Sequence, residues 1–203
     1  TFDILVHLAT LAAILVYFRK DWFQLAFLII KRERGDMPAY ILPKILLSMV
    51  PAGVIGILFK DQVEWVHARP FLVGCCLFVT AAILLLGQRV NRKGKPLEDL
   101  SWTIVLAMGC AQAFAILPGI SRAGMTIMIG LFLGMERRAS ARFSFLMAVP
   151  VIGGAGLLTL KDLVESSASV SGDLWLAYGA GSLAAVFSGF IALAFLMKLL
   201  EGP

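Results

Sequence analysis

Five stretches of the sequence are apolar and almost free of charged residues over lengths that suit a lipid bilayer. They are Ile4–Phe18, Ile41–Phe59, Phe71–Gln88, Phe143–Leu160 and Leu174–Met197. A helix that crosses the hydrocarbon core needs roughly 20 mostly apolar residues. Only a helix, among open structures, satisfies its own backbone polar groups there. The sequence therefore predicts an all-α, polytopic membrane protein with about five spanning helices, the first of which is expected to begin upstream of Thr1.

The composition excludes most soluble classes of protein. Hydrophobic residues make up 60% of the chain and charged residues 15%, whereas a soluble domain carries about 25% charged residues. The net charge of +5 would suggest nucleic acid in a soluble protein, but in a membrane protein it indicates a bias of Lys and Arg toward the cytoplasmic loops. We expect a single integral membrane domain over residues 1–203 and no nucleic-acid partner.

The apolar run Ser101–Met135 differs from the other five. It has no acidic residue, and its one charged residue, Arg122, lies near its centre, just after Pro118-Gly119. Pro and Gly break a helix, and the two arms that remain are too short to span a bilayer. Irregular backbone at that depth is tolerated where it is buried in protein or lines a polar cavity. We therefore expect a re-entrant helical hairpin over residues 101–135.

The distribution of cations agrees with a hairpin. If its two ends lie on one side of the membrane, most Lys and Arg residues share that side, in segments 19–37, 89–99 and 136–142 and at Lys198. The positive-inside rule makes this side cytoplasmic, which predicts a multi-pass protein of the inner (plasma) membrane. A pair of crossings would distribute the cations in the same way, so the short arms carry the argument for re-entry.

The residues around the break can form an anion site. An ionisable residue at membrane depth is a functional hypothesis by default, and Arg122 can bind two phosphate oxygens at once. The helix expected to begin near Ala123 points unpaired N–H groups at its N-terminus. Gly119 permits close approach of the backbone, and Ser121 and Thr126 add hydroxyls, Ser121 also as a candidate nucleophile. The alternative is a structural break, in which Ser121 caps the next helix and Arg122 snorkels or pairs with an acid.

The same residues resemble a known family signature. Residues 118–126 read PGISRAGMT, which resembles the PGxSRSxxT motif of the undecaprenyl-diphosphate phosphatases, the bacitracin-resistance family. The start of the chain, Thr1–Phe18, and the segments Gly130–Gly134 and Ala141–Pro150 are similar to the corresponding parts of that family. The resemblance implies an inverted-repeat fold with two re-entrant hairpins. It also implies an enzyme that hydrolyses a polyprenyl diphosphate to the monophosphate, recycling the lipid carrier of cell-wall synthesis.

The resemblance also implies roles for individual residues. Arg122 would neutralise developing negative charge, Ser121 would be the nucleophile or a phosphate ligand, and Thr126 would be a positioning hydroxyl. The substrate would further contact Gly119, Ala123, Gly124 and Gln112. Gln112 lies where the inverted repeat would place the counterpart of a family Glu.

Two features depart from the family pattern. Ala123 stands where the family has Ser, so this position supplies no hydroxyl. The family's ExxxE stretch and Ser-Ser-x-Gly-His segment, which precede the part similar to Thr1–Phe18, are absent, as is one further span after Pro203. We therefore expect a fragment of a longer chain, and a divalent cation (Mg²⁺ or Ca²⁺) whose ligands lie outside it.

Other functions stay open from the sequence. A lipid or anion transporter, or a flippase, would also use the N-terminus of a broken helix as an anion site. A catalytically inactive homologue is suggested by Ala123 and the absent segment. Gly130 and Gly134 form a GxxxG pattern, which we interpret as helix packing within one chain, with a homo-oligomer as the alternative.

Overall fold

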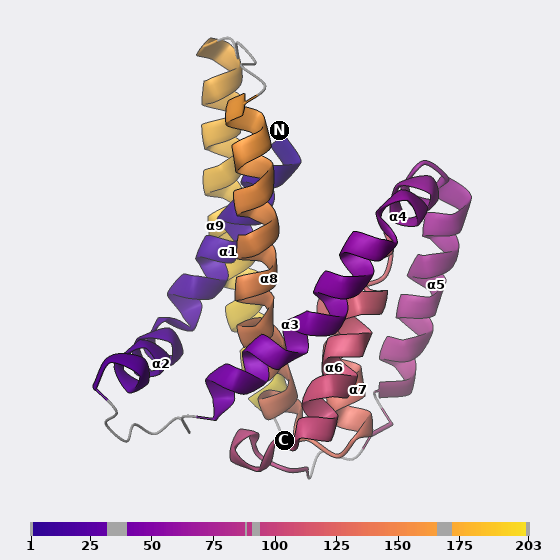
Figure 1. Cartoon of the computed structure of the whole chain (residues 1–203), viewed down its shortest axis with the longest axis vertical. Coiled ribbons are helices and arrows are strands. Elements are labelled where there is room, and N and C mark those ends of the chain that lie inside the picture. Colours follow the sequence, from indigo (N-terminus) through magenta and orange to yellow (C-terminus); the bar gives the residue numbers. More distant parts are fainter. Residues whose placement is uncertain (1, 32–39, 88, 91–93, 166–171, 202–203) are drawn as a thin grey trace. The chain divides into compact units, whose positions relative to one another are not determined.

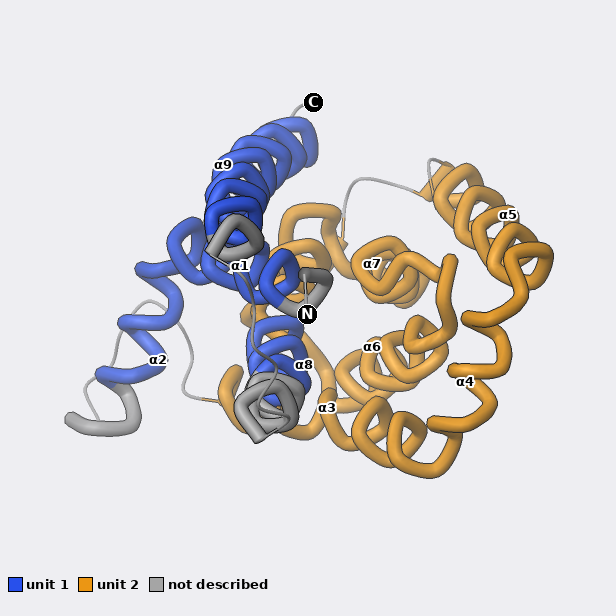
Figure 2. The backbone as a smooth tube through the Cα atoms, turned by 90° about the horizontal axis from the view of Figure 1, so that it is seen from above, with its two compact units in different colours: residues 1–33, 148–203 blue, residues 34–147 orange. Residues whose placement is uncertain are grey.

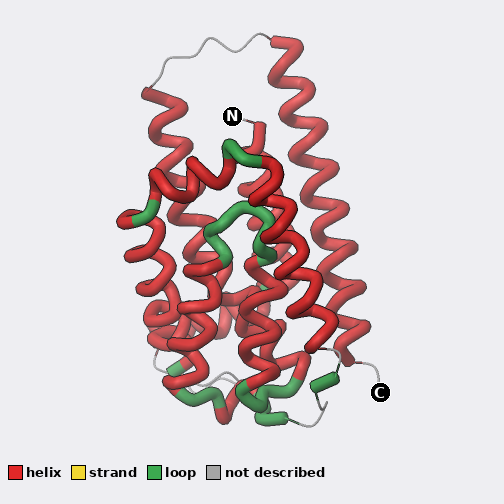
Figure 3. The backbone as a smooth tube through the Cα atoms, turned by 90° about the vertical axis from the view of Figure 1, so that its right-hand side faces the viewer, coloured by secondary structure: helices red, strands yellow, loops and turns green. Residues whose placement is uncertain are grey.

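A computed structural model describes the chain except for residues 1, 32–39, 88, 91–93, 166–171 and 202–203. The described part consists of helices and the loops that join them, without a β-strand (Figure 3). The prediction of an all-α membrane protein is confirmed. Its helices are α1 (Phe2–Tyr17), α2 (Arg19–Lys31), α3 (Ile41–Leu58), α4 (Lys60–His67), α5 (Pro70–Gly87), the short 3₁₀ helix η1 (Leu97–Asp99), α6 (Trp102–Phe114), α7 (Arg122–Phe132), α8 (Arg137–Glu165) and α9 (Gly172–Glu201).

Four of the described helices are long and apolar enough to cross a membrane. The spanning stretches are Ile41–Leu58 in α3, Pro70–Gly87 in α5, Arg137–Gly156 in α8 and Leu176–Leu200 in α9. The first predicted span, in α1, is an apolar helix below that length. Helices α3 and α5 therefore supply spanning neighbours for the segment that carries the predicted site.

The helices form two compact units (Figure 2). Unit 1 comprises residues 1–33 and 148–203, in which α1 packs along α9. The rings of Tyr17 and Phe190 meet edge to face there, with centroids 5.8 Å apart. Unit 2 comprises residues 34–147 and contains α3 to α7 together with the first turns of α8. The predicted site residues all belong to unit 2.

The run Ser101–Met135 is not one helix. Helices α6, of 13 residues, and α7, of 11 residues, pack against each other and are joined by a loop over residues 115–121 (Figure 1). Helix α3 packs along α6, and α5 packs along α7. These two contacts depend on glycines: a Cβ at Gly109 would lie 2.6 Å from the carbonyl oxygen of Ser48, and one at Gly87 would overlap the Met128 side chain.

The two ends of the hairpin are hydrogen-bonded to each other. The N–H of Lys95, just before η1, donates to the carbonyl of Gly134 at 2.8 Å, and the N–H of Glu136 donates to the carbonyl of Lys95 at 3.0 Å. The chain therefore enters and leaves the hairpin at one end of the unit. This is the arrangement predicted for a re-entrant segment.

A buried lysine fixes the entry of the hairpin to α3. Lys44 is 5% exposed, and its ammonium group donates to the carbonyl of Leu100. The same group lies 4.0 Å from the ring centroid of Tyr40 and 5.4 Å from that of Trp102. Cation–π contacts of this kind are stronger where water is excluded. The cation thus joins the first turn of α3 to the first turn of α6.

Gly130 and Gly134 have different structural roles. A Cβ at Gly130 would overlap the side chain of Ser140 in α8, so this glycine permits close packing within the chain. Gly134 has φ +90°, and the N–H of Met135 bonds back to the carbonyl of Gly130 at 3.0 Å. That pattern is a glycine C-cap that ends α7. The packing interpretation therefore applies to Gly130.

Candidate functional site

The loop between α6 and α7 lies against the wall of α5. Gly119, at its tip, has φ +91°, and a Cβ there would lie 2.5 Å from the carbonyl oxygen of Val73 and 2.9 Å from Cβ of Cys76. L-residues with a side chain avoid this backbone conformation. The tip therefore requires glycine both for its backbone angle and for its contact with α5.

Ser121 caps helix α7. Its side-chain oxygen accepts a hydrogen bond from the N–H of Gly124 at 3.1 Å, which satisfies one of the free donors at a helix start. Ser121 is exposed, and its hydroxyl proton is not used by this bond. The capping role that the sequence offered as an alternative is therefore present, and it leaves an O–H group directed at the surroundings of the tip.

The first turn of α7 supplies free donors for an anion. The Gly124 N–H is occupied by Ser121, and the Met125 N–H bonds to the carbonyl of Ser121 at 2.8 Å. In the part of the chain that the structure describes, the N–H groups of Arg122 and Ala123 have no hydrogen-bond partner. Two adjacent N–H groups with the positive end of the helix dipole behind them form an anion-binding position.

Arg122 is partly buried beside these donors. Its Nη1 donates to the carbonyl of Ser144 in α8 at 3.2 Å. No acidic residue pairs with it among the residues described, so the pairing alternative is not found there. The guanidinium has five N–H donors, and the single bond to Ser144 orients it while leaving most of them available to phosphate oxygens.

Thr126 lies one turn further along α7 and is fully buried. Its hydroxyl donates to the carbonyl of Arg122 at 2.8 Å, and its oxygen lies 2.6 Å from Oγ of Ser144, which is also fully buried. This hydroxyl is bonded to protein groups on both sides. The geometry therefore fits the predicted positioning role of Thr126 and does not present its hydroxyl to a ligand.

Two residues that complete the site were not singled out in the sequence. Ser144 holds Arg122 and Thr126 together, and Thr80 of α5 bonds to both Gly119 and Ser121. Each is a hydroxyl residue inside an otherwise apolar spanning segment. That signal was present, but many such hydroxyls bond only to their own helix, so it does not identify a partner.

Gln112 is buried without any hydrogen bond. It is 2% exposed, and neither Oε1 nor Nε2 has a partner among the described residues. Burying an unpaired amide is unfavourable by about 1–3 kcal/mol. The structure does not link Gln112 to Ser121 or Arg122 by a hydrogen bond, although it lies on α6 close to the loop that both helices share. It is the predicted site residue with unsatisfied polar atoms.

The described residues do not form a metal site. No group of three or more His, Cys, Asp or Glu side chains in the described ranges could hold a metal ion. Hydroxyls, an amide and a guanidinium surround the tip, and this donor set fits an anion. The divalent cation implied by the family resemblance stays a prediction, with ligands outside this set.

Comparison with known proteins agrees with the motif at the tip. Residues 1–202 match the family model described as "Bacitracin resistance protein BacA". The "Undecaprenyl-diphosphatase" of Elusimicrobium minutum (strain Pei191) is 41% identical over 204 residues, covering 99% of this chain and 74% of that protein. The "Undecaprenyl-diphosphatase" of Pelotomaculum thermopropionicum is 38% identical, covering 100% of this chain and 74% of that protein. The "Undecaprenyl-diphosphatase 2" of Stutzerimonas stutzeri is 38% identical, with coverage of 98% and 75%.

Proposed function

The chain belongs to the bacitracin resistance protein BacA family, and we propose that it hydrolyses undecaprenyl diphosphate to undecaprenyl monophosphate and inorganic phosphate. It is a multi-pass membrane protein and a phosphatase that acts on a lipid diphosphate. The observation that supports this function best is the position of Ser121 and Arg122 at a helix start. Because Ser121 bonds to Thr80, this start is level with the middle of spanning helix α5.

The proposed chemistry is positioning and charge neutralisation. Hydrolysis breaks the anhydride P–O bond, and water supplies the oxygen that the released phosphate gains. Negative charge develops on the terminal phosphate and on the bridging oxygen. The free N–H groups of Arg122 and Ala123 and the guanidinium of Arg122 would stabilise that charge. Such preorganised donors are strongest where water is excluded.

Ser121 has a separate proposed role at the terminal phosphate. Its oxygen caps α7, so the side chain is held in one orientation, and its O–H can donate to a phosphate oxygen. The same orientation would suit attack on the phosphorus. The proposal is a direct contact between Ser121 and the terminal phosphate, with ligand and nucleophile as two outcomes that a phosphoenzyme trap separates.

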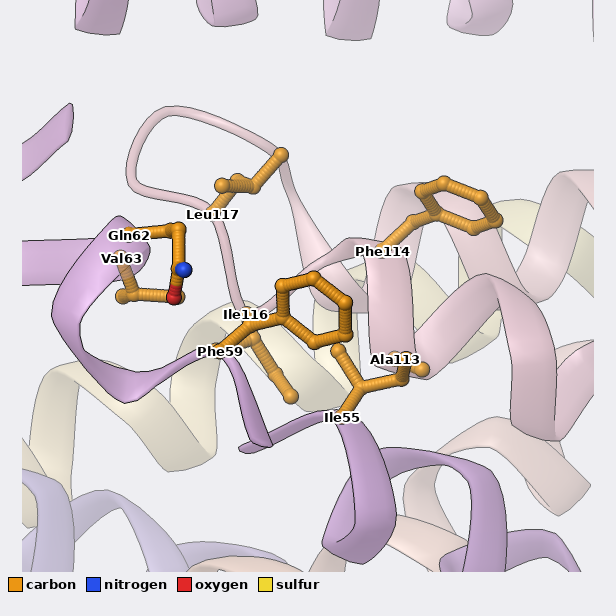
Figure 4. Close-up of a pocket in the computed structure, with 8 residues that line it drawn as sticks. All are labelled: Ile55, Phe59, Gln62, Val63, Ala113, Phe114, Ile116 and Leu117. Carbon is orange, nitrogen blue, oxygen red and sulfur yellow. The ribbon is translucent and has the colours of Figure 1, made fainter. Parts of the chain in front are cut away.

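An apolar groove beside the tip fits the lipid part of the substrate. The groove has a volume of about 230 Å³ and is lined by Ile55, Phe59, Gln62 and Val63 from α3 and α4, and by Ala113, Phe114, Ile116 and Leu117 from the end of α6 and the loop (Figure 4). Only Gln62 in this set is polar. Leu117 directly precedes Pro118-Gly119, so groove and tip share one loop. We assign the groove to the isoprene units nearest the diphosphate.

The cellular setting follows from the same proposal. The cation-rich segments would lie on the cytoplasmic side of the inner (plasma) membrane, and the product would return to cell-wall synthesis as lipid carrier. Activity in this pathway fits the bacitracin resistance for which the family is named. A homo-oligomer stays a prediction, since Gly130 already packs against Ser140 within the chain.

The proposed function is tested by phosphate release. The protein of full natural length, purified in detergent, is given undecaprenyl diphosphate, and inorganic phosphate is measured. We expect turnover by the natural protein, a loss of at least about a hundredfold in Arg122→Ala, and a substantial loss in Arg122→Lys, because a point charge does not replace a bidentate fork.

The matched control for this experiment is Arg69→Ala. Arg69 is an exposed arginine that stacks on Trp65 at 3.6 Å, between α4 and α5, and its loss should leave turnover unchanged. Binding of the lipid without phosphate release would favour a transporter or an inactive homologue. An Arg122→Ala protein with natural activity would remove this residue from the site.

A further inference from the structure

Thr80 makes two hydrogen bonds to the tip of the hairpin from a different helix. Its hydroxyl donates to the carbonyl of Gly119 at 3.0 Å and accepts from the N–H of Ser121 at 3.1 Å. Thr80 is buried, at 9% exposure, and is the only Ser or Thr in α5. One hydroxyl thus satisfies two backbone groups of the loop and uses both its proton and its oxygen.

These two backbone groups have no other source of hydrogen bonds on the α5 side. The main-chain groups of α5 are bonded within the helix, so only a side chain can reach the loop from it. An unpaired backbone group away from water is unfavourable. The tip also carries the positive φ of Gly119, which other conformations of the loop would not need. Thr80 therefore selects one conformation of this loop.

The selected conformation determines where the phosphate-binding groups lie. Ser121 is the N-cap residue, so the position of its N–H sets the direction of its side chain and the starting point of α7. Arg122 and Ala123, with their free N–H groups, follow immediately. A displacement of about 1 Å in such a site can reduce a rate about a hundredfold.

We propose that Thr80 is a positioning residue of the phosphatase site, which acts through Ser121 and the first turn of α7 without touching the substrate. This inference rests on the proposed function. The competing interpretation is that Thr80 only stabilises packing between α5 and α7. Packing has an independent basis in the close contact of Gly87 with Met128, so the two interpretations predict different results.

The test compares Thr80→Val, which keeps the shape and removes the hydroxyl, with Thr80→Ser, which keeps the hydroxyl. The control is Thr103→Val, because Thr103 is exposed on α6 and its hydroxyl bonds to the side chain of Ser101. Thermal unfolding in detergent and the folded fraction are measured for each variant of the full-length protein. All rates are expressed per folded molecule.

We expect Thr80→Val to lower kcat for undecaprenyl diphosphate about a hundredfold with a KM within a few-fold of the natural protein. Thr80→Ser should restore kcat to within about threefold, and Thr103→Val should change neither parameter. A Thr80→Val protein whose kcat per folded molecule stays within twofold of the natural value would overturn the positioning role.

A second readout does not depend on turnover. Hydrogen–deuterium exchange is followed in a peptide that covers residues 115–122 and in one that covers the start of α6. We expect Thr80→Val to speed exchange in the first peptide alone, with Thr80→Ser close to the natural protein. If the natural protein shows no phosphatase activity, the proposed function fails, while unchanged exchange in Thr80→Val would overturn the hydrogen-bonded clamp itself.

Discussion

The hydroxyl oxygens of Thr126 and Ser144 lie 2.6 Å apart, and neither side chain is exposed. Thr126 in turn bonds to the carbonyl of Arg122, whose guanidinium bonds to the carbonyl of Ser144. The three residues form a closed set of contacts between α7 and α8. The hydroxyl pair therefore fixes the backbone on both sides of the arginine that the proposed mechanism uses.

The first prediction concerns this pair. We expect Ser144→Ala and Thr126→Val each to lower kcat about tenfold, because each breaks the contact that holds the first turn of α7 against α8. The double variant should lose little more than either single variant, since residues in one hydrogen-bond network are not additive. Steady-state kinetics of all four proteins form the double-mutant cycle. Multiplying losses would show that the two hydroxyls act independently.

The second prediction concerns Ser121. Ser121→Ala removes both a helix cap, a change of about 1 kcal/mol in the free energy of unfolding, and the proposed phosphate contact. We expect kcat to fall at least about tenfold and thermal stability to fall modestly. The control is Ser188→Ala, an exposed serine whose hydroxyl bonds back to Ala184 in α9. A phosphoserine trapped at residue 121 after acid quench would assign the nucleophilic role, and natural kinetics in Ser121→Ala would contradict any role.

The third prediction uses two glycines with nearly the same backbone angle. Gly119 and Gly134 have φ of +91° and +90°, but a Cβ meets Val73 and Cys76 only at Gly119, while nothing lies within 4 Å at Gly134. Gly134→Ala should lower the free energy of unfolding by about 1–2 kcal/mol and leave activity per folded molecule intact. Gly119→Ala should be more destabilising and should abolish turnover. Equal behaviour of the two variants would mean that the contact with α5 is unimportant.

The fourth prediction concerns the unpaired amide of Gln112. Replacing it with Leu removes two buried polar atoms that lack partners, so we expect Gln112→Leu to raise thermal stability. If the amide binds substrate, the same variant should lose activity, a combination that a purely structural residue does not produce. Thermal unfolding and kinetics on one preparation decide this. Lower stability of the variant would show that the amide has a partner in the full-length protein.

The fifth prediction concerns the groove beside the tip. Val63→Phe would fill part of the space between α4 and the loop. We expect KM for undecaprenyl diphosphate to rise about tenfold, because apolar surface of the lipid is left unburied. KM for a diphosphate with a single isoprene unit should change less. Gln62→Ala, which removes the polar lining residue, is the control, and equal effects on both substrates would contradict the assignment.

Much of the architecture follows from local features of the sequence. The apolar runs predict the spanning helices because each stretch must satisfy its own backbone in lipid. The break at Pro118-Gly119 is steric and depends on adjacent residues. The charge of Arg122 within an apolar run indicates function for the same reason: its burial is unfavourable wherever the chain folds. These properties need no knowledge of neighbouring helices.

The partners of the site residues depend on tertiary packing. Thr80 lies far from Ser121 in the sequence, as Ser144 does from Arg122, and no periodicity relates their positions. Thr126 matches the motif on paper, yet packing of α8 against α7 buries its hydroxyl and makes it a positioning group. A hydrogen bond between helices depends on the rotation and register of both to within a few tenths of an ångström. Local propensity fixes which residues are helical and where the chain breaks, but only the packed structure decides which hydroxyl meets which backbone group.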